Sequence, residues 1–189
     1  MVALIAGVAG GAVGATVVGT VEELLRQRRA RQSTGWTVSA AHTVSLQGLD
    51  PDSRKVVSVA RQEAIQNGHS YVGSENLAMA LRLYVTPTLG RIWSVLAIDP
   101  DVLRRRIEAT VPPILGPTPM EGAFTPRISR IIAIANTLAA QRKRAEAPPE
   151  LLLLALVDEG GGTGAHALAS LGATAQRVRE VVDGAARDG

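Results

Sequence analysis

The chain has 189 residues, no cysteine and a formal net charge of +3, with 46% hydrophobic, 20% charged and only 3% aromatic residues. This length suits one domain, with or without an appendage. The lack of cysteine excludes a disulfide-stapled fold, a thiolate nucleophile and a cysteine-ligated metal site. Because aromatic side chains are scarce and aliphatic ones abundant, the core is predicted to consist of close-packed helices rather than a β-sandwich.

Much of the apolar content lies in residues 2–21, VALIAGVAGGAVGATVVGTV, which contain no charged side chain. A helix of this length spans about 30 Å, the thickness of the hydrocarbon core of a bilayer. Basic residues after such a helix favour the cytoplasmic side and contact anionic lipid headgroups. We therefore expect residues 1–32 to be a single-pass anchor in the cell membrane, with the C-terminal domain in the cytoplasm. If the helix does not insert, the protein is expected to be cytoplasmic. The basic collar consists of Arg26, Arg28, Arg29 and Arg31.

Four glycines in this segment raise the further expectation of self-association, because small residues let helix backbones approach closely in a membrane. They are Gly7, Gly10, Gly11 and Gly14. An anchor that is merely rich in Gly and Ala remains an open alternative. The same glycines lack the G-x-G-x-x-G spacing of a dinucleotide-binding loop.

The rest of the chain contains an internal duplication. A shift of 75 positions lays residues 49–107 over residues 124–182 without a gap, and the apolar positions coincide. Identical pairs include Pro51 with Pro126, Glu75 with Glu150, and Leu77 with Leu152. The predicted parts are a linker at 33–48, repeat one at 49–111, a Pro-rich connector at 112–123 and repeat two at 124–186, within a module at 49–189.

Each copy is predicted to form four helices, which gives an all-α, eight-helix bundle with pseudo-twofold symmetry after the N-terminal hydrophobic helix. A capping residue followed by proline marks the first helix of each copy, and Ser74 is expected to cap the second helix of repeat one. The predicted starts are Asp50-Pro51 and Thr125-Pro126, Ser74-Glu75 and Pro149-Glu150, Thr88 and Thr163, and Asp99-Pro100 and Thr174.

The string GHSYVGSENL at residues 68–77 makes a family recognisable. It resembles the motif GHNYVGTEHLLLGLL of the N-terminal domain of the Clp chaperone ATPases, a double-repeat module. The FTPR string at residues 124–127 and the ALASLGA string at residues 167–173 also resemble the second copy of that domain. The resemblance covers about residues 49–186. It implies an eight-helix fold that receives substrates, adaptors or degron-tagged proteins for unfolding and proteolysis.

The resemblance also implies ligand-binding residues. In relatives that are receptors for phosphoarginine, an acidic residue in each copy holds the guanidinium, and backbone amides at the helix start hold the phosphoryl group. The matching positions here are Glu75, with Ser74, in repeat one and Glu150 in repeat two. Carboxylates pair well with the planar guanidinium, and helix N-termini bind anions.

Two departures from the family motif weigh against this assignment. Pro148-Pro149 replaces Gly-Thr in repeat two, which removes two backbone donors and a hydroxyl, and Asn76 replaces the usual histidine in repeat one. The alternative is that both glutamates only stabilise the positive end of a helix, which contributes about 0.3 to 1 kcal/mol each.

We expect no enzyme, catalytic residue, metal site or cofactor. A working unfoldase needs G-x-x-x-x-G-K-[ST] to bind nucleotide phosphates. The nearest glycine-rich string, GGGTGAHA at residues 160–167, has no lysine. The three histidines, His42, His69 and His166, lack the i, i+4 spacing of a metal-binding helix.

The first hypothesis is a noncatalytic, membrane-tethered module that binds polypeptide substrates, adaptors or Clp protease components and so modulates proteolysis. The second is a decoy that sequesters small-molecule or peptide ligands of Clp N-domains. The third is a nucleic-acid-binding regulator. It is disfavoured because the basic clusters at residues 104–106 and 142–144 have no aromatic residues beside them for base stacking.

Overall fold

Residues 44–114 and 123–185 are described in the computed structural model, and they lie within one unit, Ala40–Gly189. The expected anchor at residues 1–32, with its basic collar and its four glycines, falls outside the described residues. In the part that is described, no helix is both long and apolar enough to cross a membrane.

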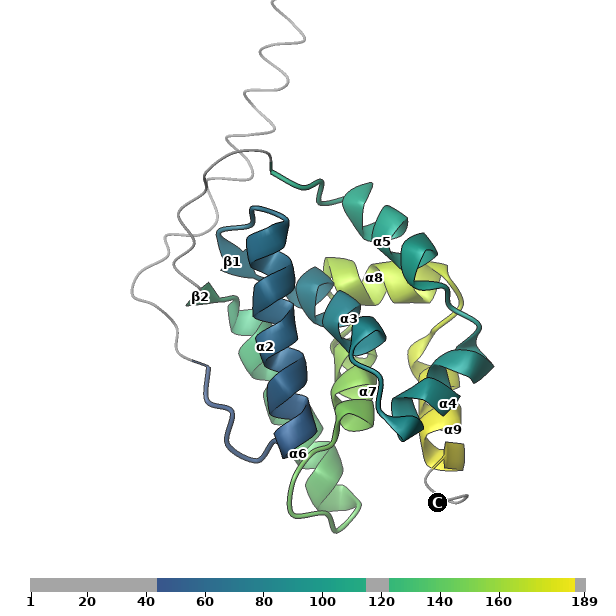
Figure 1. The fold of residues 1–189 in the computed structure, drawn as a ribbon. Coiled ribbons are helices and arrows are strands. Elements are labelled where there is room, and N and C mark those ends of the chain that lie inside the picture. The colour runs from purple at the N-terminus through teal and green to yellow at the C-terminus, as the bar shows by residue number, and fades with distance from the viewer. Residues whose placement is uncertain (1–43, 115–122, 186–189) are drawn as a thin grey trace, which may run out of the picture. The chain divides into compact units, whose positions relative to one another are not determined.

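Eight helices and two short strands form this part of the chain, in agreement with the predicted all-α bundle (Figure 1). Three of the four pairs of equivalent helices start 75 residues apart, and the α4/α8 pair starts 76 apart. Repeat one contributes α2 (Pro51–Gln66), α3 (Ser74–Leu83), α4 (Pro87–Leu96) and α5 (Pro100–Glu108). Repeat two contributes α6 (Pro126–Gln141), α7 (Pro149–Glu159), α8 (Thr163–Ser170) and α9 (Ala175–Ala185).

Side-chain caps and prolines define where several helices begin. The Asp50 carboxylate accepts a hydrogen bond from the Ser53 N–H at 2.7 Å, directly before Pro51. Thr86 caps α4 in the same way, so that helix begins at Pro87, one residue before its predicted start. The prediction that Ser74 caps α3 is wrong. Gly73 is the N-cap and Ser74 is the first helical residue, whose hydroxyl is used elsewhere.

Two short parallel pairings join the copies. Strand β1 (Tyr71–Val72) pairs with β2 (Ala123–Phe124), and an isolated bridge joins Leu49 to Ala147. Adding 75 to Val72 and subtracting 75 from Phe124 gives Ala147 and Leu49, so the two pairings are equivalent. These pairings were not predicted, because two residues are too few to give a strand pattern in the sequence.

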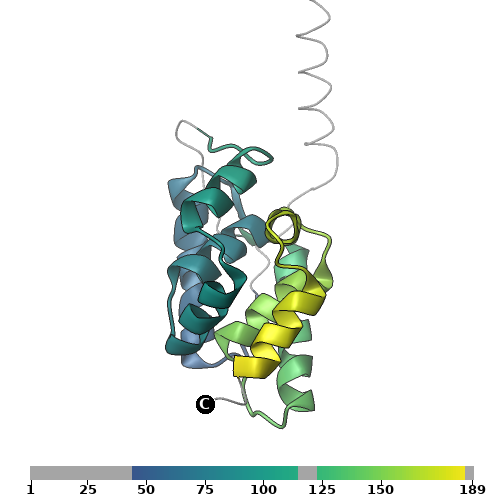
Figure 2. The same cartoon turned by 90° about the vertical axis from the view of Figure 1, so that its right-hand side faces the viewer.

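Helices α3 and α7 form the centre of the bundle. Every residue of α7 from Pro149 to Val157 is buried, and α3 is buried from Ser74 to Leu81. Helix α2 packs on α3, α6 packs on α7, and α8 and α9 pack on α3 and α7 respectively. In Figure 2 the two copies lie side by side, one in blue to teal and the other in green to yellow. A helix that is apolar all round needs neighbours on every side, which explains why α7, with its continuous apolar run from Leu151 to Val157, is central.

Candidate ligand-binding site

A tight turn places the candidate site of repeat one at the start of α3. Gly68 has φ of +68°, and a Cβ there would lie 2.2 Å from the carbonyl oxygen of Ile114, so only glycine fits. The chain then runs through β1 to Gly73, and Glu75 becomes the second residue of α3.

The Glu75 carboxylate is buried and folds back over the backbone at the start of its own helix. Glu75 is only 5% exposed, and a Cβ on Gly73 would lie 2.1 Å from Glu75 Oε1. Ser74 Oγ donates a hydrogen bond to Oε2 at 3.4 Å, whereas Oε1 has no partner among the described residues. Glu75 therefore offers a desolvated acceptor for a cationic donor.

A second buried group with an unused polar atom lies in the same loop. Asn76 Oδ1 accepts from the Gly73 N–H at 2.9 Å, and Asn76 Nδ2 lies 3.3 Å from His69 Nδ1. This arrangement assigns the proton of His69 to Nε2, which has no partner within the described part of the chain. Asn76, which replaces the histidine of the family motif, thus orients His69 and satisfies the amide before α3.

Tyr71 covers the edge of this loop. Its ring stacks on His69 with a centroid separation of 6.2 Å. Burial raises the pKa of the Tyr71 hydroxyl, and the negative charge of Glu75 raises it further. The hydroxyl therefore stays protonated near neutral pH and remains a hydrogen-bond donor.

Ser74 ties this loop to repeat two. Its Oγ accepts a hydrogen bond from the Gly164 N–H at 3.2 Å, and a Cβ on Gly164 would lie 2.1 Å from the Ser74 carbonyl oxygen. The Ser74 hydroxyl is therefore part of the contact between α3 and α8, in addition to its hydrogen bond with Glu75.

An arginine beside this contact already has a partner. Arg127 Nη1 donates to Glu159 Oε1 at 2.6 Å, and Arg130 donates to the same oxygen at 3.3 Å. Burial alone would raise the pKa of Glu159, but hydrogen bonds from Arg127, the Gly161 N–H and Arg130 together lower it. Arg127 thus serves to connect the start of α6 to the end of α7.

Glu150, the third predicted site residue, has different surroundings. It is 8% exposed and is the second residue of α7, as Glu75 is of α3. Its Oε1 accepts a hydrogen bond from Arg144 Nη1 at 3.0 Å. The two preceding residues, Pro148 and Pro149, have no N–H to donate. The structure therefore places both glutamates at equivalent helix positions, but of the two only Glu75 has a fully buried oxygen without a hydrogen-bond partner among the described residues.

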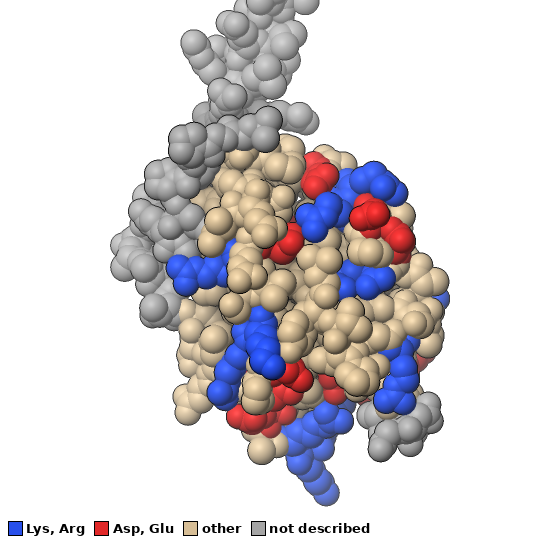
Figure 3. Space-filling model, in the orientation of Figure 1, with Lys and Arg blue, Asp and Glu red and all other residues tan. Residues whose placement is uncertain are grey.

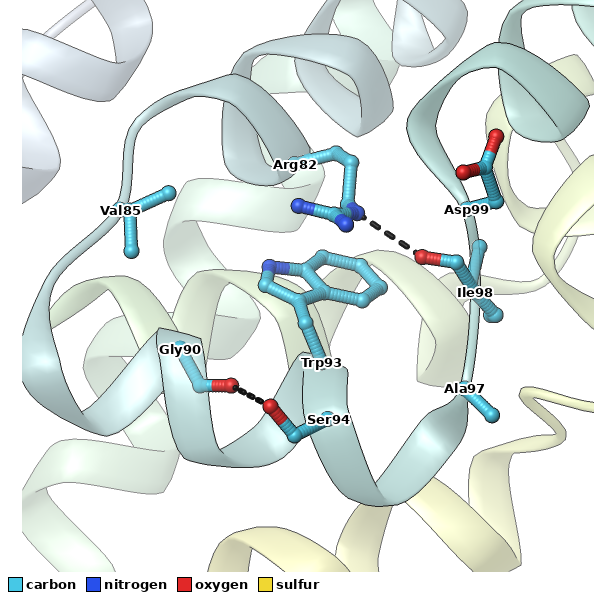
Figure 4. Close-up of a pocket in the computed structure, with 8 residues that line it drawn as sticks. All are labelled: Arg82, Val85, Gly90, Trp93, Ser94, Ala97, Ile98 and Asp99. Carbon is cyan, nitrogen blue, oxygen red and sulfur yellow. Dashed lines mark hydrogen bonds between the residues drawn. The ribbon is translucent and has the colours of Figure 1, made fainter.

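A separate hollow, which sequence reasoning missed, lies between α3, α4 and the start of α5 (Figure 4). It measures about 340 Å³ and is walled by Arg82 and Trp93, among other residues. The guanidinium of Arg82 lies 5.6 Å from the Trp93 ring centroid, and its Nε donates to the Ile98 carbonyl at 3.0 Å. The Trp93 indole N–H donates to the Leu81 carbonyl at 3.0 Å. Both side chains are therefore fixed.

The charged surface shows no single-sign face in the view of Figure 3, where acidic side chains lie among basic ones. Across the described ranges, 44–114 and 123–185, no group of three or more potential metal-ligating side chains occurs.

Comparison with known proteins identifies relatives of this fold. Residues 123–189 match the family described as "Clp repeat (R) N-terminal domain". Chloroplastic chaperone protein ClpC1 of Oryza sativa subsp. japonica is 31% identical over 128 residues, which is 68% of this chain and 14% of the relative. Chloroplastic ClpC2 of the same species is 29% identical over 157 residues, 83% of this chain and 16% of the relative. The chain thus spans about one seventh of the length of these relatives.

Solved structures share the fold at low sequence identity. The N-terminal domain of the caseinolytic protease associated chaperone ClpD from Arabidopsis thaliana superimposes with a TM-score of 0.60 at 16% identity, covering 75% of this chain and 96% of that one. The Hsp104 N-terminal domain from Candida albicans gives 0.59 at 15% identity, covering 72% and 89%.

Proposed function

Since this chain carries a Clp repeat N-terminal domain, homologous to the N-terminal region of ClpC chaperones, we propose that it is a noncatalytic receptor for polypeptides, either protein substrates or adaptors. The observation that carries this proposal is the buried Glu75 carboxylate, whose Oε1 finds no partner in the described residues. An acceptor left unpaired inside a protein costs about 1 to 3 kcal/mol. A ligand that supplies a donor would recover this energy.

The chemistry around Glu75 fits a phosphoarginine-type degron. The guanidinium of the ligand would pair with the Glu75 carboxylate, because both groups are planar and opposite in charge. The first backbone N–H groups of α3 have no carbonyl partner within the helix, and they lie at its positive end, where a phosphoryl group is stabilised. Both halves of the ligand would thus be held at one helix start.

Calorimetry with a phosphoarginyl peptide tests this proposal. Binding is expected with the wild-type chain, and Glu75→Gln should weaken it at least tenfold because the guanidinium loses its anionic partner. Asp101→Asn is the matched control. Asp101 also occupies the second position of a helix, α5, but it is exposed. No detectable heat, or equal weakening by both substitutions, would contradict the proposal that this site binds a phosphoarginine degron.

We propose further that residues 1–32 hold this receptor at the membrane, with the basic collar at anionic lipid. The support is the uncharged run at residues 2–21, followed by four arginines within residues 22–31. Fractionation of the full chain under alkaline wash is the test. Protein that remains with the membrane pellet supports the anchor, and protein released to the supernatant contradicts it.

A decoy for ligands of Clp N-domains is the second candidate function. It is favoured by the hollow beside Arg82 and Trp93, whose volume of about 340 Å³ is sufficient for a small ligand. A small molecule that binds Clp N-domains should raise the melting temperature of this chain, and unchanged melting would count against the decoy. The interleaved charges in Figure 3 give no support to a nucleic-acid partner.

A further inference from the structure

The two copies use the same turn to place one side chain before the second helix. Gly68 and Lys143, which are equivalent, both have positive φ, +68° and +56°. The next residue donates its N–H to an equivalent carbonyl in each copy, His69 to Ala64 and Arg144 to Ala139, at 2.9 Å in both cases. The side chains of residues 69 and 144 therefore start from equivalent points of the backbone.

From this common start the two side chains make different contacts. His69 is 4% exposed and is held by Asn76, and Glu75 keeps an unpaired oxygen among the described residues. In repeat two, Leu151 stands where Asn76 is, and Arg144 instead pairs with the glutamate of its own copy at 3.0 Å.

We propose that Glu150 is a guanidinium-binding site that the chain fills with its own Arg144. The duplicated module thereby has one acidic site that Arg144 closes and one whose buried carboxylate keeps an unpaired oxygen among the described residues. Arg144 supplies the planar donor that an external arginine or phosphoarginine would otherwise supply. The inference rests on the proposed function only in taking the unpaired Glu75 carboxylate as a ligand-binding group.

Exposure explains how the closed site can be opened. The Arg144 side chain is 43% exposed, whereas that of Glu150 is only 11% exposed. Removing Arg144 therefore leaves a buried carboxylate facing a gap that opens to solvent. A further hollow of about 440 Å³, which Arg144 lines together with residues of α6, adjoins this gap.

The prolines before Glu150 restrict the ligand class. Pro148 and Pro149 present no N–H to a phosphoryl group. The opened site should therefore favour arginine over phosphoarginine, which distinguishes it from the site at Glu75.

The experiment is an NMR titration of the full chain with N-acetyl-arginine amide as the probe. Every variant also carries Glu75→Ala, so that the probe cannot bind at the acidic site of repeat one. With Glu75→Ala alone, no binding is expected at repeat two. With Glu75→Ala and Arg144→Ala together, chemical shifts at the start of α7 should change as probe is added and saturate as a 1:1 complex forms. Adding Glu150→Ala should abolish the binding again.

Arg142→Ala is the matched control, because Arg142 lies in the same turn but pairs with Asp183 at 2.6 Å. It should not open the site. If Arg144→Ala unfolds the chain, Arg144→His restores the residue type that repeat one carries and is titrated instead. Probe binding at α7 with Arg144 intact, or its absence in the folded Arg144 variants, would overturn the proposal. Neither outcome depends on whether phosphoarginine binds at Glu75.

Discussion

Glu75 is a residue whose burial is unfavourable for the folded chain. Its Oε1 is shielded from water and unpaired in the described residues, whereas the equivalent Glu150 is paired with Arg144. The buried carboxylate at this position of the duplicated fold thus has different hydrogen-bond partners in the two repeats. In repeat two the carboxylate is paired within the chain, and in repeat one an oxygen of the carboxylate stays without a partner among the described residues.

Replacing Glu75 with leucine should stabilise the chain while removing the acidic site. The change relieves an unpaired acceptor that costs about 1 to 3 kcal/mol and loses a helix-dipole contribution of about 0.3 to 1 kcal/mol. A net gain of about 1 kcal/mol is expected, which corresponds to a rise in Tm of about 3 °C for a chain of this size. Thermal unfolding followed by circular dichroism measures it. A lower Tm would show that Glu75 contributes to folding.

Arg144→Ala should act in the opposite direction, because it leaves the buried Glu150 carboxylate without its partner. A hydrogen bond to a charged group contributes about 1.5 to 3 kcal/mol, and solvent screening at the 43% exposed Arg144 side chain places the loss below this range. Urea unfolding should show a loss of about 1 kcal/mol. A stability equal to that of the wild type would mean that the ion pair contributes nothing to folding.

At the scale of elements, prolines and caps made the helix starts predictable. In three predicted pairs the first residue is the observed N-cap and the proline is the first residue of the helix. These pairs are Asp50-Pro51, Asp99-Pro100 and Thr125-Pro126. What could not be predicted depends on contacts between distant segments. The strand pairing of Val72 with Phe124 joins residues 52 positions apart, and no local pattern encodes it. The pairing of Arg144 with Glu150 depends on how an irregular turn directs one long side chain.

The contact between α3 and α8 should tolerate no side chain at Gly164. A Cβ there would come 2.1 Å from the Ser74 carbonyl oxygen and 3.0 Å from Ala78 Cβ, so the helices must separate. Gly164→Ala is expected to cost about 1 to 3 kcal/mol, as overpacking does. Gly184→Ala is the control, because nothing lies within 4 Å of its Cβ, and alanine should stabilise α9 there by about 0.5 to 1 kcal/mol. Equal effects of the two substitutions would contradict the close approach.

The link between α6 and α7 should make stability depend on pH. The pKa of Glu159 is lowered in the folded chain from its ordinary value of 4.5. Its contribution is therefore present above pH 4.5 and is lost as the pH falls through the lower, folded-state pKa. Urea unfolding between pH 3 and pH 6 should show this loss in the wild type and a smaller one in Arg127→Ala. Identical pH profiles would exclude Arg127 as the cause.

At the scale of the molecule, the two copies share one core. Helix α3 of repeat one packs on α8 of repeat two, and α4 packs on α9. Each copy also closes a short pairing with the other, through Val72 and Phe124 or through Leu49 and Ala147. Neither repeat buries its apolar helices alone.

A chain of residues 44–114 alone is therefore expected to lack a cooperative unfolding transition, whereas residues 44–189 should melt in one step. The physical reason is that the apolar surface of α3 that meets α7 and α8 would be exposed to water. Differential scanning calorimetry compares the two. A sharp transition in the shorter chain would show that the first repeat is an independent domain.

The burial of Trp93 beneath Arg82 has a spectroscopic consequence. Trp93 is only 3% exposed and belongs to repeat one, and repeat two has Leu168 at the equivalent position. In a Trp36→Phe background its indole becomes the sole tryptophan fluorophore of the chain. A buried indole emits at shorter wavelength and is shielded from iodide. Its emission therefore provides an optical signal that reports on one half of a nearly symmetric molecule without any added label.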